Sequence, residues 1–470
     1  MARIMKILSL ATALLVAQIG RADTLWDVYQ LARQNDPQLR EADANRSAIR
    51  EAKPQALGAV LPQASGTLNW TQDQTDSNST GVNFGATPGV TETHSRIDKT
   101  GWVLQLRQTV FRWDQWVRVR QADKQVLQAD VDYRVAELAL YTRVADAYFN
   151  VLATDDTLAA NVAAREAIGR QLEQAQKRFE VGLIAITDVQ EAQSGYDQSV
   201  AAEILAKRAL ANSKEVLREI IGDYPGELAK PKAEIPLISP APADENQWVE
   251  VALQQNLSLQ SAQIGADIAR DNISIAKSGH MPTVDFVASH SDNRGRGNQS
   301  TLFNGAPAIG ATANDNDTDS FGLQFALPIF SGGITNSKVN QSVYQHRAAK
   351  ERLERTARQT ERSTRDAYLA VNSEISRVQA LQQALKSAQT ALQATEAGYE
   401  VGTRTTVDVL AGRQQLYQAE TNYARSRYDY IVNVLKLKEA AGTLDDKDVE
   451  EVNNWLEPPA PAPAPAPKAE

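Results

Sequence analysis

Hydrophobic positions along the chain follow two spacings, which predict long helices and short strands. Over residues 112–179 and 336–399, apolar side chains recur every three or four positions, the spacing of a coiled-coil seam. Two shorter segments, 187–221 and 407–441, continue with helical patterns. At about 1.5 Å per residue, the longest helices would each reach roughly 100 Å, far more than a globular core requires. The pattern therefore predicts two long helical hairpins.

Alternation of apolar and polar residues predicts four strands. The runs of alternation lie at 64–70, 102–110, 284–289 and 321–329. We expect each strand to span about 10 residues, enough to cross a bilayer at a tilt. The segments 72–100 and 292–319 are polar, and we expect them to be loops.

These strands allow two interpretations. They could form a small soluble sheet with one buried face, or a transmembrane wall whose apolar side chains face lipid and whose polar side chains face a water-filled lumen. Four strands are too few to close a barrel around an aqueous pore, and a sheet edge cannot stay open in lipid. A membrane location therefore requires several chains to share one barrel.

The chain repeats itself at a constant offset of 220 residues. The segment 179–189 aligns without a gap with 399–409, and each contains Val-Gly followed by Asp-Val. Glycine supplies a positive φ, and the aspartate can cap the returning helix, so each segment is predicted to be a hairpin tip. Gly222 and Gly442 match at the same offset. The repeat indicates a tandem duplication of one architectural half.

The two halves and their flanking segments define the expected domain organisation. We expect a signal peptide at 1–22, a first repeat at 23–222 with a β-hairpin at 62–111 and a tip at 181–188, a linker at 223–247, a second repeat at 248–442 with a β-hairpin at 282–330 and a tip at 401–408, an equatorial segment at 443–457 and a disordered tail at 458–470. The signal peptide follows from cations before an apolar run. Further helices are expected at 25–56 and 248–277. The linker is rich in proline, and the tail alternates proline and alanine.

Composition narrows the possible partners. The net charge is −9, and loss of the segment 1–22, with its three cations Arg3, Lys6 and Arg21 and no acid, makes it −12. This balance argues against nucleic acid. The chain has no cysteine, so it forms no disulfide and carries no lipid on a cysteine.

Enzyme and metal chemistry are not indicated. The four histidines are scattered, without the spacing of metal ligands. The segment 315–319 begins like a calcium loop but lacks the required glycine and glutamate, so we expect a solvated loop. We find neither a nucleophile motif nor a phosphate loop in the sequence, and we expect no catalytic activity and no cofactor.

The duplicated half, the paired strand runs and the tip motifs resemble the TolC family of outer-membrane efflux ducts over nearly the whole mature chain. The motifs that carry the resemblance are residues 181–189, 327–333 and 397–405. The resemblance implies an α+β membrane protein, internally duplicated, with long α-helical coiled-coil hairpins forming a periplasmic tunnel and four transmembrane β-strands per chain. A homotrimer would complete a 12-stranded β-barrel, in agreement with the strand count. The implied location is the outer membrane, with a large periplasmic portion.

The resemblance also implies a function and partners. The chain would be the exit duct of tripartite efflux and type I secretion systems, a passive conduit that contributes to multidrug resistance. Its partners would be a periplasmic adaptor, an inner-membrane pump of the RND or ABC type, and outer-membrane lipid. The alternative is that the chain is itself a periplasmic coiled-coil adaptor without a pore. The paired strand runs and the absence of cysteine argue against that alternative.

Residue roles at the tips follow from the same resemblance. The implied gate residues are Thr187, Asp188, Tyr399, Arg404, Gln171 and Glu396, with Tyr399 and Arg404 facing Thr187 and Asp188. Asp408 would form a constriction ring, and Gly182 and Gly402 would receive the adaptor. Ala411 stands where the family has a second acid, which predicts a weaker negative field and weaker block by multivalent cations. Without the resemblance, Arg404 and Asp188 would be taken as ordinary solvated charges.

Overall fold

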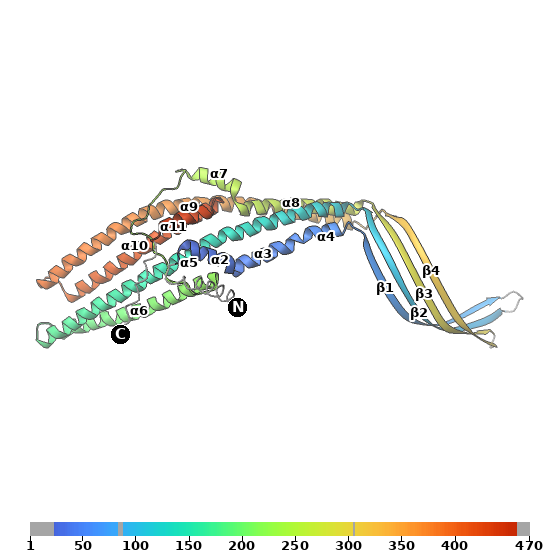
Figure 1. The fold of residues 1–470 in the computed structure, drawn as a ribbon, viewed down its shortest axis with the longest axis horizontal. Coiled ribbons are helices and arrows are strands. Elements are labelled where there is room, and N and C mark those ends of the chain that lie inside the picture. The colour runs from blue at the N-terminus through green and yellow to red at the C-terminus, as the bar shows by residue number, and fades with distance from the viewer. Residues whose placement is uncertain (1–22, 83–87, 304–305, 458–470) are drawn as a thin grey trace, which may run out of the picture. The chain divides into compact units, whose positions relative to one another are not determined.

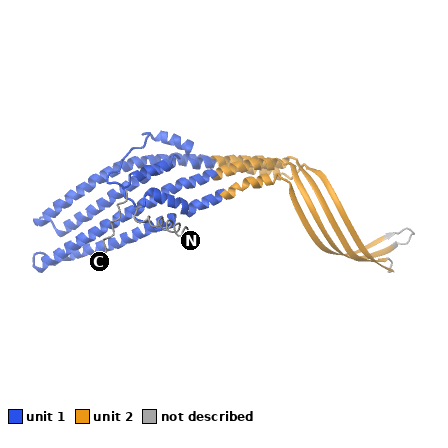
Figure 2. Ribbon diagram, in the orientation of Figure 1, with its two compact units in different colours: residues 1–46, 130–262, 352–470 blue, residues 47–129, 263–351 orange. Residues whose placement is uncertain are grey.

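The computed structural model describes residues 23–82, 88–303 and 306–457. They form two compact units, coloured separately in Figure 2. Unit 1 comprises residues 1–46, 130–262 and 352–470, and unit 2 comprises residues 47–129 and 263–351. The expected signal peptide and Pro-Ala tail lie outside the described residues.

Unit 2 is built on one antiparallel sheet whose strands follow chain order, β1-β2-β3-β4 (Figure 1). The strands are β1 (Gln63–Val82), β2 (Pro88–Phe111), β3 (Thr283–Phe303) and β4 (Ala306–Ala326). Leu106 lies opposite Ala288, which lies opposite Phe321, and in the next row Ser289 lies opposite Ser320. Because opposed residues share a face and successive residues alternate, this part of the sheet has one apolar and one polar face.

The apolar face is open to its surroundings in the single chain. Leu68 is 79% exposed and Phe321 is 85% exposed. A contiguous exposed surface of this kind marks contact with another chain or with lipid. At the sheet edges, β1 and β4 each pair with one neighbour only among the described residues.

The strands are about twice as long as expected. They contain 20, 24, 21 and 21 residues. The segments 72–100 (apart from 83–87, which are not described) and 292–319 (apart from 304–305) were expected to be loops, and this was wrong, as was the solvated loop at 315–319. Polar side chains extend the ladder because they pair across strands: Lys99 lies 2.6 Å from Asp73, and Arg296 forms an ion pair with Asp315.

Four long helices form the hairpins: α5 (Trp113–Glu180), α6 (Ile186–Ile221), α9 (Ile334–Glu400) and α10 (Thr406–Ala441). No proline interrupts any of them, and their bounds lie within two residues of the expected ranges. Both returning helices, α6 and α10, end at a glycine C-cap in the left-handed conformation, Gly222 (φ 83°) and Gly442 (φ 74°). This shared ending places the same stop signal in both repeats.

The shorter helices are α2 (Leu25–Asn35), α3 (Pro37–Arg50), α4 (Ala52–Gly58), α7 (Glu245–Gln255), α8 (Leu257–Lys277), the 3-10 turn η1 (Ser278–His280) and α11 (Asp446–Asn454). The helices expected over 25–56 and 248–277 are therefore confirmed, and both are interrupted. The breaks fall at Asp36 and Asn256, 220 residues apart, with a further break at Glu51. The side chain of Asp36 accepts a hydrogen bond from the Leu39 amide at 2.9 Å, and Asn256 accepts one from Leu259 at 3.1 Å. The breaks at Asp36 and Asn256 are thus caps that start the next helix, whereas Glu51 makes no side-chain cap.

The main core of unit 1 joins the hairpins to the linker. Tyr148 is fully buried, and its hydroxyl donates to the Ala229 carbonyl at 2.7 Å. The linker pairs with the chain ends through isolated bridges, Asp23 with Leu228 and Pro231 with Leu456. Within the described residues, no helix has both the length and the apolar character needed to cross a membrane.

Candidate functional site

The two hairpin tips have the same backbone turn. At the first tip, the Gly182 amide donates to the Phe179 carbonyl at 2.9 Å and the Leu183 amide to the Arg178 carbonyl at 2.9 Å. At the second tip, the Gly402 and Thr403 amides make the equivalent bonds. Crossed bonds of this kind, closed by a left-handed residue, are a Schellman ending, and the glycines have φ of 73° and 77°. The duplication therefore preserved the turn itself.

The helices that leave the two tips begin differently. Helix α10 starts with a capping box, in which the Asp408 carboxylate accepts from the Thr405 amide at 2.9 Å and the Thr405 hydroxyl accepts from the Asp408 amide at 3.2 Å. The Thr405 amide and hydroxyl both donate to the Asp408 carboxylate, and these bonds, together with nearby Arg404, lower the pKa of Asp408. Helix α6 has Ala185 at the same position, without a side-chain cap. Among the described residues, the carboxylate of Asp188 has no hydrogen-bond or ion-pair partner.

Tyr399 contacts the opposite hairpin, but through a residue that the sequence did not suggest. Arg178, in the last turn of α5, donates from Nη1 to the Tyr399 hydroxyl at 2.8 Å. Its guanidinium carbon also lies 5.4 Å from the centroid of the Tyr399 ring. Both side chains are half-buried. One hydrogen bond and one cation–π contact thus join the two tips within a single chain.

Arg404 and Asp188, expected to lie together, are not paired within this chain. The stem of Arg404 lies over Gly398, where a Cβ would approach the Arg404 Cγ to 2.8 Å. Its guanidinium has no ion-pair partner among the residues that the structure describes. Thr187 is exposed. Among the described residues, the Arg404 guanidinium on the second tip and the Asp188 carboxylate on the first therefore remain without a partner.

Gln171 and Glu396 do not bond to each other within this chain. Gln171 is 6% exposed, and its Nε2 has no partner among the described residues. Glu396 is bonded by Arg413 of the same hairpin, with Nη2 at 2.8 Å. Arg413 was missed by the sequence analysis. Spacing alone gives no signal for it, because residue 396 lies 4 residues before the end of α9 and residue 413 lies 7 residues after the start of α10.

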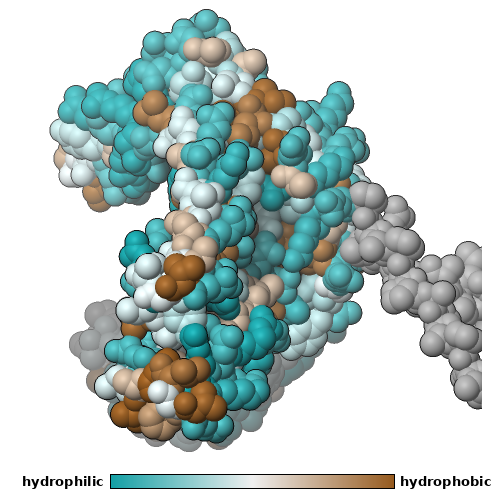
Figure 3. All heavy atoms as spheres, turned by 90° about the vertical axis from the view of Figure 1, so that its left-hand side faces the viewer, coloured by the Kyte–Doolittle hydropathy of each residue, from teal (hydrophilic) through white to brown (hydrophobic). Residues whose placement is uncertain are grey.

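The tips expose apolar side chains to their surroundings. Val181 and Leu183 are each 69% exposed, and Val401 is 75% exposed. Figure 3 looks onto the hairpin ends, where brown apolar atoms gather among teal polar ones. Behind the first tip, a small buried cluster of Leu172, Ala175, Val189 and Ala192 anchors the turn. Each tip is therefore held from inside its hairpin and leaves its outer surface unoccupied.

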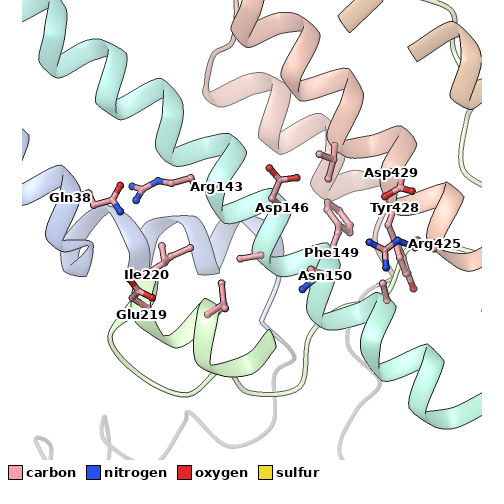
Figure 4. A pocket seen from close by; sticks show the side chains of 14 residues that line it. Gln38, Arg143, Asp146, Phe149, Asn150, Glu219, Ile220, Arg425, Tyr428 and Asp429 are labelled. Atoms are coloured by element: carbon pink, nitrogen blue, oxygen red, sulfur yellow. The ribbon is translucent and has the colours of Figure 1, made fainter. Parts of the chain in front are cut away.

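A separate cleft of about 490 Å³ lies between α5, α6 and α10. Figure 4 shows its lining, with an apolar floor around Phe149 and charged side chains at its rim. Two of the lining charges are paired: Arg143 lies 2.6 Å from Asp36, and Asp146 lies 2.9 Å from Lys436. The cleft is lined by helices of both hairpins, and we assign no chemistry to it. Among the described residues, no group of three or more His, Cys, Asp or Glu side chains could hold a metal ion.

Comparison with known proteins gives concordant matches. The family model described as "Outer membrane efflux protein" matches residues 28–223 and 248–443, one match in each repeat. The chain is 38% identical over 448 residues to the outer membrane protein TolC of Escherichia coli (strain K12), covering 94% of this chain and 87% of that protein. It is 28% identical over 453 residues to the alkaline protease secretion protein AprF of Pseudomonas aeruginosa, covering 96% and 91%.

Solved structures share the fold. The Campylobacter jejuni CmeC outer membrane channel superposes with a TM-score of 0.71 at 18% identity, covering 92% of this chain and 90% of that chain. The outer membrane protein VceC of Vibrio cholerae superposes with a TM-score of 0.69 at 20% identity, covering 89% and 96%. At these identities the structures support the fold alone.

Proposed function

The chain belongs to the outer membrane efflux protein family, and from this premise we propose that three copies close one barrel and that contacts between the hairpin tips gate its periplasmic entrance. The chain is an outer-membrane exit duct of the efflux and type I secretion class. The alternative, a periplasmic adaptor, has no support from these matches, which describe outer-membrane channels and secretion proteins.

One observation supports the trimer above all others: the sheet is two-faced and has two free edges. Large apolar side chains such as Phe325, 64% exposed, cover one face, while the other face is polar. Lipid does not tolerate unpaired strand edges, so β1 of one copy must meet β4 of the next. Three copies give 12 strands, enough to surround water. The polar face then lines the lumen.

The gate would use the charges that remain unpaired in the single chain. Arg404 and Tyr399 of the second tip would reach Thr187 and Asp188 of a first tip, in the same or a neighbouring copy. A charge-assisted hydrogen bond contributes about 1.5–3 kcal/mol when partly shielded from water. Gln171, whose buried Nε2 lacks a partner, would bind Glu396 once that carboxylate leaves Arg413. Loss of these links would open the entrance.

The remaining roles concern ions and partners. Asp408 would form a ring of one acid per copy, and Ala411 leaves the second position uncharged. Gly182 and Gly402 would admit the backbone of a periplasmic adaptor, which would in turn connect the duct to an inner-membrane pump. The exposed apolar side chains at the tips supply a surface for that contact.

The test is the single-channel conductance of the purified protein in planar bilayers. Wild type should conduct weakly and steadily, and the double change Arg404→Ala, Tyr399→Phe should raise conductance severalfold. An unchanged conductance would retain the duct and reject the gate residues. Absence of any conductance from a folded, membrane-inserted protein would reject the pore.

A further inference from the structure

The contact between Arg178 and Tyr399 links the two hairpins within one chain. Each hairpin is closed by its own turn, so nothing covalent holds the first tip beside the second. Between residues 171–192 and 391–413, all of which the structure describes, the bond from Arg178 Nη1 to the Tyr399 hydroxyl is the one hydrogen bond that crosses from tip to tip.

We propose that Arg178 is a gate residue, which holds the second tip closed by binding the hydroxyl and ring of Tyr399. The proposal rests on the proposed gated duct and adds a link inside each copy to the expected links made by Arg404. Arg178 stands at the end of α5, where the helix dipole favours a cation, and its own carbonyl accepts the Leu183 amide that closes the turn. Its Cα is therefore fixed by the tip.

The duplicated halves differ at the two positions that form this link, so the arginine comes from the first tip and the tyrosine from the second. At the offset of 220, Arg178 aligns with Gly398, and Phe179 aligns with Tyr399. The first tip thus has the cation without the phenol, and the second tip has the phenol without the cation. Gly398 also leaves the space over which the Arg404 stem lies, since a Cβ there would meet the Arg404 Cγ at 2.8 Å. The two arginines therefore project from different tips and do not compete for one site.

Lys177 provides a matched control. It is the neighbouring cation on α5, 69% exposed, and it pairs within its own helix with Glu173 at 2.6 Å. Replacing Lys177 by Gln removes the same charge from the same turn without touching Tyr399. A general effect of charge at the entrance would appear in both variants, whereas loss of the link would appear only in Arg178→Gln.

The experiment measures the conductance of full-length protein in planar bilayers for Arg178→Gln, Lys177→Gln, Tyr399→Ala and the pair Arg178→Gln, Tyr399→Ala. We expect Arg178→Gln to shift the closed-to-open ratio about tenfold toward open, equivalent to about 1.4 kcal/mol. Lys177→Gln should behave as wild type. In the Tyr399→Ala background, Arg178→Gln should add nothing, because the partner is already gone.

Each contrary result has a distinct meaning. If Arg404→Ala opens the channel but Arg178→Gln does not, or if the effects of Arg178→Gln and Tyr399→Ala add, the link is not part of the gate, while the duct stands. If no variant conducts although all insert into the bilayer, the proposed function fails.

A second measurement does not depend on loss of a side chain. Because the chain has no native cysteine, Arg178→Cys with Tyr399→Cys introduces one reactive pair. Joining the pair with a short reducible bis-thiosulfonate reagent should lower conductance, and dithiothreitol should restore it. A channel that opens equally with the pair joined would overturn the proposal.

Discussion

Substitution of the glycines at the ends of α9 and α10 can distinguish an effect on adaptor binding from an effect on the stability of the fold. Both have positive φ, 77° at Gly402 and 74° at Gly442. A Cβ on Gly402 would meet nothing within 4 Å in the chain. A Cβ on Gly442 would lie 2.7 Å from the Gln255 carbonyl oxygen and 2.9 Å from the Asn256 Cα. The same substitution therefore has different consequences at the two ends.

We consider Asn at both positions, since Asn tolerates the left-handed conformation best after Gly. The conformational cost is about 1 kcal/mol or less at either site. At Gly442 the new side chain must also displace backbone, which adds about 1–3 kcal/mol. Gly442→Asn should thus destabilise the protein by about 2–4 kcal/mol, and Gly402→Asn by no more than about 1 kcal/mol.

Adaptor binding should be affected more by Gly402→Asn than by Gly442→Asn, the reverse of the order expected for stability. If an adaptor backbone approaches the tip at Gly402, an added side chain costs about 1–3 kcal/mol of binding, which corresponds to about a 5- to 150-fold loss of affinity. Gly402→Asn should therefore fold and insert normally, yet bind adaptor weakly and export poorly.

Denaturation of the detergent-solubilised protein and adaptor binding in the same preparation measure the two effects. Equal stability of the two variants would refute the packing argument at Gly442. Wild-type adaptor affinity and export in Gly402→Asn would refute docking at the tip.

Three further predictions concern charge. The side chain of Asp285 is 4% exposed and forms ion pairs with Arg112, at 2.9 Å, and with Arg107. Asp285→Ala should destabilise the sheet by about 3 kcal/mol, the lower end of the range for a broken buried ion pair, because both arginines reach solvent. The heat resistance of the folded barrel measures this effect. Burial raises the pKa of Glu439, and its hydrogen bond with Thr142 partly opposes this shift. The folded protein therefore loses stability as pH rises from about 4.5 through the pKa of Glu439 in the folded state. In denaturant, Glu439→Gln should be more stable than wild type at neutral pH and equal to it below about pH 4. Ala411→Asp should strengthen block of conductance by a trivalent cation about tenfold or more. Each added carboxylate contributes about 1 kcal/mol per unit charge of the cation at 4 Å in water, and the proposed trimer would place three of them in the ring. Unchanged block would exclude position 411 from the ring.

The long helices could be predicted closely because their signal is repeated many times. A spacing of three and four residues persists through α5 and α9, of 68 and 67 residues, so a single misplaced residue changes little. The apolar strand rows were also predictable, since Leu106 lies between Gln105 and Arg107, and Phe321 follows Ser320. Helix breaks were missed, although Asp36 before Pro37 is a plausible cap.

The polar halves of the strands could not be predicted from hydrophobic alternation. Between Trp70 and Thr100, apart from residues 83–87, most side chains on both faces are polar, so neither face shows a regular apolar row. What holds these strands is the backbone ladder together with cross-strand pairs such as His94 with Asp76 at 2.7 Å. Such pairs depend on register, and register is set by the neighbouring strand rather than by the strand itself.

At the tips, the turns were predictable and their contacts were not. Periodicity predicts which residues share a helix face, but a contact between hairpins depends on how the hairpins pack. Comparison of the two repeats indicates in part where such contacts lie. Arg178 aligns with Gly398, and Ile184 aligns with Arg404, so these positions differ between the two halves. Where the two repeats differ in sequence at an otherwise matching turn, a contact between the two hairpins of one chain is a natural explanation to test.

This divergence also explains how a duplicated hairpin can serve as a gate. On the first tip, Ile184 packs against the buried cluster and Ala185 cannot cap, which leaves Asp188 without a partner in the chain. On the second tip, Thr405 occupies Asp408 through the capping box, which leaves the Arg404 guanidinium unpaired. Among the described residues, the Arg404 guanidinium and the Asp188 carboxylate thus remain without a partner on opposite tips. In the proposed gate, contact between hairpins would pair these two charges, so opening the entrance would break that contact.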